Sequence, residues 1–348
     1  MKRLTQEVLV LTILHMLVDG ICAATIYANL YNDHLILPIV VFVGYNVFAF
    51  MLQPLMGIMI DTYKKERLLV LGSLALVIMG ALLGKIPYLC LLLLGLGNAL
   101  FHTSAGKITI KSSNNKLSLL GIFVSLGVIG LTVGMLYSAS SILLVILIIL
   151  TLITGGCFYF MNRRNKGFLF TEQIVTTHEM SFKNKNLLII LGIIVVVMFR
   201  GMIGKYTIFH WANQSYLILF VAIATALGKA LGGIMADKVG IKATIIISGV
   251  GSLGLLLFAR NTMIGGLLGI LLFNMTMPIT LYLLYKRMPK YEATAFGLAA
   301  MILFPGYVIG MYLQGYPVLY NLVISVATIV TIIFVIYSIK GVNENEVS

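Results

Sequence analysis

Long apolar runs separated by short polar or turn-forming stretches extend along the whole chain. The runs are about twenty residues long, which is enough for an α-helix to cross about 30 Å of hydrocarbon. Gly, Pro, Asn and charged residues mark where the runs end. The pattern predicts an all-α membrane protein with twelve transmembrane helices, at about residues 6–29, 36–60, 68–85, 88–107, 118–137, 141–161, 187–209, 216–236, 243–259, 263–285, 292–313 and 317–339.

The longest polar interval extends from Asn162 to Asn186, between the sixth and seventh predicted helices. It divides the chain into six helices plus six. We therefore expect an N-terminal six-helix bundle at 1–162, a cytoplasmic connector at 163–186 and a C-terminal six-helix bundle at 187–348.

Composition excludes a water-soluble domain. Hydrophobic residues make up 60% of the chain, charged residues make up 10%, and the mean hydropathy is +1.05. A soluble domain carries about a quarter charged residues. The first apolar run is too long for a signal peptide and lacks an A-x-A-like cleavage site, so we expect it to remain as the first helix.

The net charge is +13, and the Lys and Arg residues cluster in alternate loops rather than in one patch. If the N-terminus lies inside, most Lys and Arg residues fall in inner segments, and only Lys85 and Arg260 lie in outer loops. The positive-inside rule then predicts a multi-pass protein of the cell membrane with both termini in the cytoplasm. No basic patch is interleaved with aromatic residues, so we expect the lipid bilayer, and no nucleic acid, as a partner.

The three cysteines, Cys22, Cys90 and Cys157, all lie inside apolar runs. They have neither CxxC spacing nor a neighbouring His cluster. The sequence therefore predicts no disulfide, no metal site and no cofactor.

One short charged sequence motif occurs twice in the chain. GIMIDTYKK begins at Gly57 and GIMADKVGIK begins at Gly233, 176 positions later. A fixed offset over about a hundred residues indicates a duplicated six-helix unit. The same offset relates Asn98 to Asn274, Gly121 to Gly297, Gly130 to Gly306, and Gly134 to Gly310.

The repeated residues have a physical use at the inner helix ends. Gly57 and Gly233 allow two helices to approach closely. Asp61 and Asp237 could each meet a helix N-terminus, which carries about half a positive charge. The alternative is that both carboxylates are solvated loop-end acids.

This pattern resembles the Gly-x-x-x-Asp-[Arg/Lys]-x-Gly-[Arg/Lys] loop of the major facilitator superfamily of secondary transporters. Gly233, Asp237, Lys238 and Gly240 follow it, whereas in the first copy Thr62 and Lys64 replace a basic residue and Gly. The resemblance covers the whole chain. It implies alternating access, a monomer, and gating contacts from Asp61 to the start of the eleventh helix and from Asp237 to the start of the fifth.

Ionisable residues inside the apolar runs are candidates for function, because a charge costs about 2.5–3.5 kcal/mol at mid-bilayer on insertion scales. His15 and Asp19 are four residues apart and share a face of the first helix. Arg200 lies five residues beyond Val195, the equivalent of Asp19 at the 176-residue offset. Asp19 and Arg200 could form a structural salt bridge, or Asp19 could exchange protons under the control of Arg200 and His15.

Asn98 and His102 lie in the run GNALFHTSAGK of the fourth helix. This run and LHMLVDG are similar to the fosmidomycin-resistance-like efflux branch of the superfamily, except that Thr103 replaces Pro. The fourth helix lacks the Arg common in drug/proton antiporters, and Leu131 replaces Pro in the fifth. His102 could carry a proton or be a packed residue. Asn98 and Asn274 could bind substrate or join helices.

Gly130, Gly134, Gly306 and Gly310 form close-packing faces suited to a rocking interface. Arg200, Lys205 and Lys229 outnumber Asp19 inside the helices, which suits an anionic substrate, although both lysines could extend to the interface instead.

We therefore expect a non-enzymatic secondary transporter that exports small drug-like or anionic molecules by proton antiport. Uptake of an organic anion is the first alternative. A membrane-embedded enzyme or a non-transporting receptor is the alternative of another class.

Overall fold

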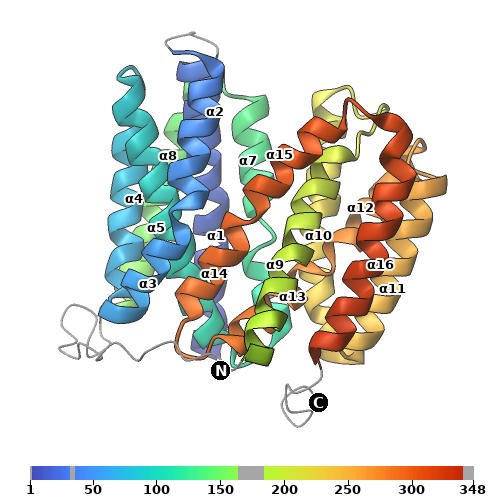
Figure 1. Ribbon diagram of the computed structural model, residues 1–348. Helices are drawn as coiled ribbons and strands as arrows, with labels where there is room; N and C mark the ends of the chain where they lie inside the picture. The colour runs from blue at the N-terminus through green and yellow to red at the C-terminus, as the bar shows by residue number, and fades with distance from the viewer. Residues whose placement is uncertain (1, 32–35, 164–183, 340–348) are drawn as a thin grey trace. The chain divides into compact units, whose positions relative to one another are not determined.

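The computed structural model describes residues 2–31, 36–163 and 184–339, where every regular element is a helix (Figure 1). Backbone groups in lipid must be hydrogen-bonded within the protein, and a helix achieves this inside one segment. The α-helices are α1 (Lys2–Thr25), α2 (Pro38–Asn46), α3 (Gln53–Tyr63), α4 (Glu66–Leu82), α5 (Pro87–Ser113), α6 (Leu117–Phe123), α7 (Gly127–Leu136), α8 (Ser141–Asn162), α9 (Asn184–Tyr206), α10 (Ser215–Val239), α11 (Ile241–Phe258), α12 (Met263–Asn274), α13 (Met277–Arg287), α14 (Glu292–Met301), α15 (Leu303–Leu313) and α16 (Tyr320–Ile339).

The predicted all-α membrane fold is confirmed. Eleven helical stretches of the described residues are long and apolar enough to cross a membrane. The twelfth predicted helix corresponds to α4, which has 17 residues. Several predicted helices consist of consecutive pieces. Short π-helical stretches, Ile26–Tyr31 and Val47–Met51, extend α1 and connect α2 to α3.

The chain forms two compact units, and each unit includes one segment from the other half of the sequence. Unit 1 comprises Met1–Ser113, Leu126–His178 and Lys290–Gly297, and unit 2 comprises Asn114–Ser125, Glu179–Pro289 and Leu298–Ser348. The predicted bundles at 1–162 and 187–348 follow the sequence halves and stay a prediction. Most of the predicted connector, 163–186, lies outside the described residues.

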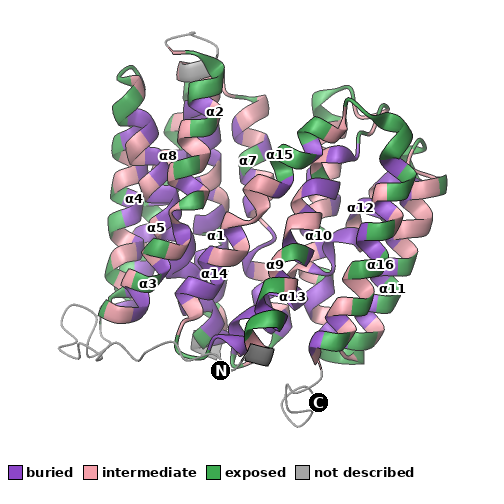
Figure 2. Ribbon diagram, viewed as in Figure 1, coloured by how far each residue is buried: buried purple, intermediate pink, exposed green. Residues whose placement is uncertain are grey.

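In unit 1, α1 packs against α5, α7 and α8, and α4 packs along α5. The helix α5 is buried along most of its length, whereas α8 exposes many apolar side chains (Figure 2). Exposed apolar side chains suit a lipid-facing helix, and the burial of α5 provides an interior for polar groups.

In unit 2, α9 packs against α15 and α16, α10 packs against α6 and α12, and α11 packs against α12 and α16. Buried residues of α9 and α16, among them Ile203, Tyr206 and Ile324, form part of its apolar core. This packing holds α9, which carries Arg200, against α15 and α16.

Besides the second span, where Leu52 separates the π-helical stretch from α3, three predicted spans are broken helices. The break between α12 and α13 precedes Pro278, and the break between α14 and α15 precedes Pro305. Proline has no N–H group to donate to the carbonyl four residues earlier, which explains these two breaks. The break between α6 and α7 lies at residues 124–126 and precedes Gly127.

The repeated glycines occupy equivalent packing positions in the two units. A Cβ at Gly130 would lie 1.9 Å from the carbonyl oxygen of Met16, and one at Gly306 would lie 2.2 Å from that of Met198. A Cβ at Gly134 would likewise lie very close to a carbonyl oxygen of α1, and a Cβ at Gly310 to a carbonyl oxygen of α9. Only glycine allows these helix backbones to approach so closely.

The same contacts correct the sequence alignment of the first and seventh spans. Gly134 faces the carbonyl of Gly20, and Gly310 faces that of Met202, which is an offset of 182 rather than 176. The equivalent of Asp19 is therefore Gly201, next to Arg200, and not Val195. The offset changes because the stretch from the first span to the second is six residues longer than the stretch from the seventh span to the eighth.

Candidate functional site

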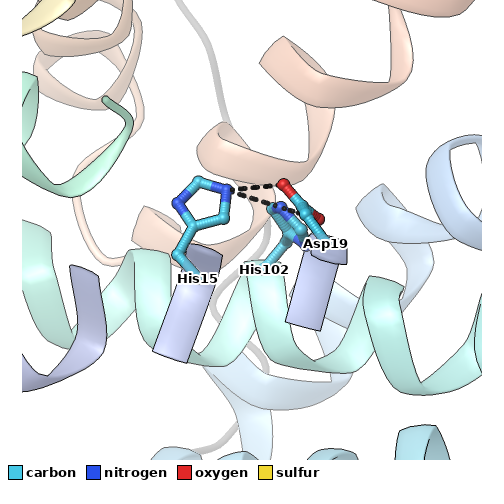
Figure 3. A group of neighbouring side chains, drawn as sticks. All are labelled: His15, Asp19 and His102. Carbon is cyan, nitrogen blue, oxygen red and sulfur yellow. Dashed lines mark hydrogen bonds and ion pairs between the residues drawn. The ribbon is translucent and has the colours of Figure 1, made fainter. Parts of the chain in front are cut away.

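A cluster of titratable side chains lies inside unit 1, on α1 and α5. His15 and Asp19 are one turn apart on α1, and Asn98 and His102 are one turn apart on α5. Figure 3 shows the two imidazoles and the carboxylate directed toward one another. The sequence predicted His15 and Asp19 on one helix face, and the packing of α1 on α5 adds the other two residues.

The distances join these groups in one network. His15 Nε2 lies 3.3 Å from Asp19 Oδ2, and His102 Nε2 lies 3.6 Å from Asp19 Oδ1. The two imidazole Nε2 atoms are 2.9 Å apart. Asn98 Nδ2 donates to Asp19 Oδ1 at 3.0 Å. Both histidines are buried, and the Asp19 side chain is 14% exposed.

Hydrogen-bond chemistry sets the number of protons in the network. His102 Nδ1 lies 2.9 Å from the carbonyl oxygen of Asn98, which can only accept, so Nδ1 carries a proton. In neutral His102, Nε2 is then an acceptor. His15 Nε2 must donate, because two unprotonated nitrogens 2.9 Å apart would repel each other.

The network therefore has room for a second proton. With one proton on His15 Nε2, His102 Nε2 and Asp19 Oδ1 are two acceptors 3.6 Å apart. A further proton on Asp19 would turn this pair into a donor and an acceptor, whereas a proton on His102 Nε2 would also require the proton of His15 Nε2 to leave. The cluster can thus change its charge by one unit without rearranging its helices.

Gly127, at the first turn of α7, lies against this cluster. A Cβ there would lie 2.4 Å from His15 Nε2 and 2.5 Å from Asp19 Oδ2. Any larger residue would displace the polar groups. The sequence analysis did not select Gly127, which directly follows the break in the fifth span.

The three ionisable groups could also hold a metal ion. Two imidazole nitrogens and one carboxylate oxygen lie within 4.8 Å of one another, and this donor set suits a divalent transition metal. The sequence predicted no metal site, because His15 and His102 are far apart in the chain. His102 Nδ1 is held by a carbonyl, as is usual for a metal-binding imidazole.

The first repeated Asp occupies a buried site within unit 1. Asp61 accepts hydrogen bonds from the backbone N–H groups of Ala293 at 3.1 Å and Thr294 at 2.9 Å, and from the Thr294 hydroxyl at 2.8 Å. These groups form the N-terminus of α14, the first part of the eleventh span. Lys107 Nζ lies 3.2 Å from Asp61.

Lys107 is itself almost completely buried. Its ammonium donates to the carbonyl oxygen of Ile60 at 2.9 Å and lies 3.8 Å from Glu66. Sequence reasoning placed Lys107 with the inner-loop cations and missed it as a partner of Asp61. Its position within the long apolar run of α5 was the available signal.

The second repeated Asp makes the matching backbone contacts within unit 2. Asp237 accepts from the N–H groups of Leu117 at 2.8 Å and Ser118 at 2.9 Å, at the N-terminus of α6. The residues capped by Asp61 and by Asp237 are related by the 176-residue offset. Lys238, the other predicted gating residue, is exposed beside Asp237.

The repeated glycines bring these helix ends together. A Cβ at Gly57 would lie 2.6 Å from the Thr294 backbone, and a Cβ at Gly233 would lie 2.2 Å from the Leu117 carbonyl oxygen. Gly121 packs on Lys229 in the same way as Gly297 packs on Gln53.

The predicted site residues of the second half lie in unit 2. Arg200 Nη2 donates to the Thr276 hydroxyl. Asn274 donates to the carbonyl oxygen of Ile270 in its own helix. The two asparagines of the repeat therefore differ, since Asn98 binds a carboxylate whereas Asn274 bonds within α12. The predicted pairing of Asp19 with Arg200 joins different units and stays a prediction.

No protein-family model and no curated protein matches the chain. The fold, however, is similar to solved transporter structures. The E. coli fucose:proton symporter FucP matches with a TM-score of 0.69 and 12% identity, over 96% of this chain and 98% of that one. FucP in an outward conformation, described as a major facilitator superfamily transporter, gives a TM-score of 0.71 at 12% identity over 95% and 97% of the two chains.

A third similar structure is a bacterial homologue of the iron transporter ferroportin in an outward-facing state. It gives a TM-score of 0.58 and 12% identity, over 97% of this chain and 98% of that one. The chain therefore has the fold of major facilitator superfamily transporters. These neighbours are transporters rather than enzymes.

Proposed function

We propose that this protein is a proton-coupled secondary transporter that exports small organic molecules by alternating access. The observation that carries the proposal is the His15–Asp19–His102 cluster, which has a vacant protonation position inside a helical bundle. A coupled carrier needs a titratable group whose charge can change within the membrane. The transporter fold supports this use of the cluster.

Asp19 and the two histidines are proposed to take up and release the coupling proton. With both histidines neutral, uptake of one proton cancels the negative charge of Asp19, and release of that proton restores the charge. Asn98 holds the carboxylate in place through its 3.0 Å bond. Substrate binding and proton binding would therefore influence each other through the charge of one cluster.

Asp61 and Asp237 are proposed as gating residues, together with Gly57, Gly233 and Lys238. Each carboxylate caps a helix from the other half of the sequence: Asp61 caps α14, which follows it, and Asp237 caps α6, which precedes it. A cap of this type can form in one conformation and break in another, because water can replace it at a helix end. Breaking both caps would release the predicted cytoplasmic ends of the fifth and eleventh spans.

Export is supported by the resemblance of LHMLVDG and GNALFH to the efflux branch described above. Uptake of an organic anion by proton symport is the second candidate, and the excess of Arg200, Lys205 and Lys229 over Asp19 inside the spans favours it. We further propose a monomer in the cell membrane with both termini in the cytoplasm. An enzyme or a receptor would show no substrate-dependent proton movement.

The test is a proton-flux screen in everted membrane vesicles energised by respiration. Small organic anions, zwitterions and lipophilic cations are added singly, and a pH-gradient dye reports proton release. We expect at least one compound to dissipate the gradient with the wild type and not with Asp19→Asn. Thr12→Val is the matched control, since Thr12 is a buried residue of α1 that bonds only to its own helix in the structure.

Two results would contradict the proposal. One is substrate flux in Asp19→Asn that still moves protons, which would remove the cluster from coupling. The other is movement of a divalent metal ion, without any organic compound, that depends on His15 and His102. In intact cells, medium alkalinisation on addition of substrate would support symport in place of export.

A further inference from the structure

Arg200 has unused hydrogen-bonding capacity in the interior of unit 2. The residue is 8% exposed, and among the described residues its Nη2 atom alone has an acceptor, the Thr276 hydroxyl. Its Nε and Nη1 atoms are buried without an acceptor among the described residues. A guanidinium does not lose its proton in proteins, so the charge and both N–H groups require compensation.

The described part of unit 2 offers no carboxylate to compensate this charge. Among the described residues of that unit, Asp237 is the one acidic side chain, and both of its oxygens accept backbone N–H groups of α6. A buried cation without an acidic partner in its own bundle favours binding of an anion, because an uncompensated buried charge is costly.

A small cavity lies beside Arg200, between α9, α11, α12 and α16. Its polar lining consists of Arg200 and the hydroxyl-bearing residues Ser252, Thr276, Thr328 and Thr331. Apolar side chains form the remaining walls, among them Val196, Ile203, Ile245 and Phe273.

The size of this cavity limits which anions can bind in it. Its volume is about 20 Å³, and on the same measure a single water needs about 10–15 Å³. Phosphate, sulfate or an organic carboxylate would need more room and more donors. Water could satisfy the N–H groups but would leave the positive charge without a counter-ion.

We propose that this cavity, the Arg200 pocket, binds one monovalent inorganic anion of the size of chloride. Arg200 Nε and Nη1 supply two donors. The hydroxyls of Ser252 and Thr331 now donate to carbonyls of their own helices, at 3.1 and 2.7 Å, and can rotate toward an anion. The anion would hold α9, α11 and α16 together, and the proposal does not depend on transport or on its direction.

The experiment measures thermal unfolding of the purified full-length protein in detergent. Sodium chloride is titrated against sodium gluconate at constant ionic strength, and bromide replaces chloride in a parallel series. We expect chloride and bromide to raise Tm by a few °C with saturation, because a ligand that binds only the folded state stabilises it. Equilibrium binding of radioactive chloride should give one ion per chain.

The variants identify the site. Arg200→Gln should abolish both the Tm shift and chloride binding, whereas Lys205→Gln, on the same helix outside the pocket, should retain both. If Arg200→Gln does not fold, Thr331→Leu fills the pocket and leaves the guanidinium in place, and it should also abolish binding. Asp19→Asn should have no effect on chloride binding.

Three outcomes would overturn the proposal. They are a wild-type Tm that does not differ between chloride and gluconate, chloride binding that survives in Arg200→Gln or Thr331→Leu, and chloride binding that appears only in Asp19→Asn. The last result would show that Asp19 is the counter-ion of Arg200.

Discussion

The two copies of the Gly–Asp loop have the same backbone geometry but different surroundings. Asp61 and Asp237 each accept two backbone N–H groups at a helix N-terminus, at distances between 2.8 and 3.1 Å. Asp61 is buried and paired with buried Lys107, whereas Asp237 is exposed. Position 283, the equivalent of Lys107, is Leu. Duplication has thus kept the cap, and the charge network is specific to the first copy.

This difference predicts unequal effects of removing the two carboxylates. Asp61→Ala would leave the Lys107 ammonium buried beside an uncapped helix, and breaking a buried ion pair costs about 3–5 kcal/mol. We expect a large fall in Tm in detergent. Asp61→Ala combined with Lys107→Met should recover much of the loss. An equal effect of Asp61→Ala and Asp237→Ala would contradict the comparison.

The close approach at Gly57 should be the next most sensitive feature. In Gly57→Ala the added methyl would lie 2.6 Å from backbone atoms of Thr294, which cannot move without displacing α14. Overpacking of this kind costs about 1–3 kcal/mol. Gly72→Ala is the matched control, because a Cβ at Gly72 meets no atom within 4 Å. Tm values of the two variants in detergent should differ clearly, and similar values would count against the contact.

Asp237→Ala should have a smaller effect on stability. It removes an exposed helix cap and leaves no buried charge, and the loss of such a cap costs about 1 kcal/mol. We expect its main effect on the equilibrium between conformations in which the cap at Leu117 is formed or broken. Labelling of single cysteines near Leu117 should become faster in Asp237→Ala. Unchanged labelling would show that Asp237 has no role in gating.

The smallest effect is expected where the first copy of the Gly–Asp loop differs from the second. Lys64 adopts a left-handed conformation with φ 53°, at the position where the second copy has Gly240 with φ 88°. A left-handed conformation costs a residue other than glycine about 1–2 kcal/mol. Replacement by glycine removes this strain, but part of the gain is lost because glycine loses more backbone entropy on folding. Lys64→Gly should therefore raise Tm slightly, and a lower Tm would show that the Lys64 side chain stabilises the turn.

The helices and their duplication were predictable, because lipid imposes long apolar segments and the repeat preserves Gly and Asp at a fixed offset. His15 and Asp19 were predictable as an i, i+4 pair. Three features required the folded chain: Lys107 against Asp61, Gly127 against the cluster, and the 182-residue offset between α1 and α9. They depend on helix packing across long sequence separations, which periodicity within one helix does not report.

The central claim is that the His15–Asp19–His102 cluster couples a proton to transport. The most direct measurement uses proteoliposomes and one substrate found in the vesicle screen, with the wild type, Asp19→Asn and Thr12→Val compared in two assays. We predict that Asp19→Asn loses accumulation driven by a pH gradient and keeps substrate exchange without a gradient, while Thr12→Val retains both. Gradient-driven accumulation by Asp19→Asn at the wild-type rate would contradict the account.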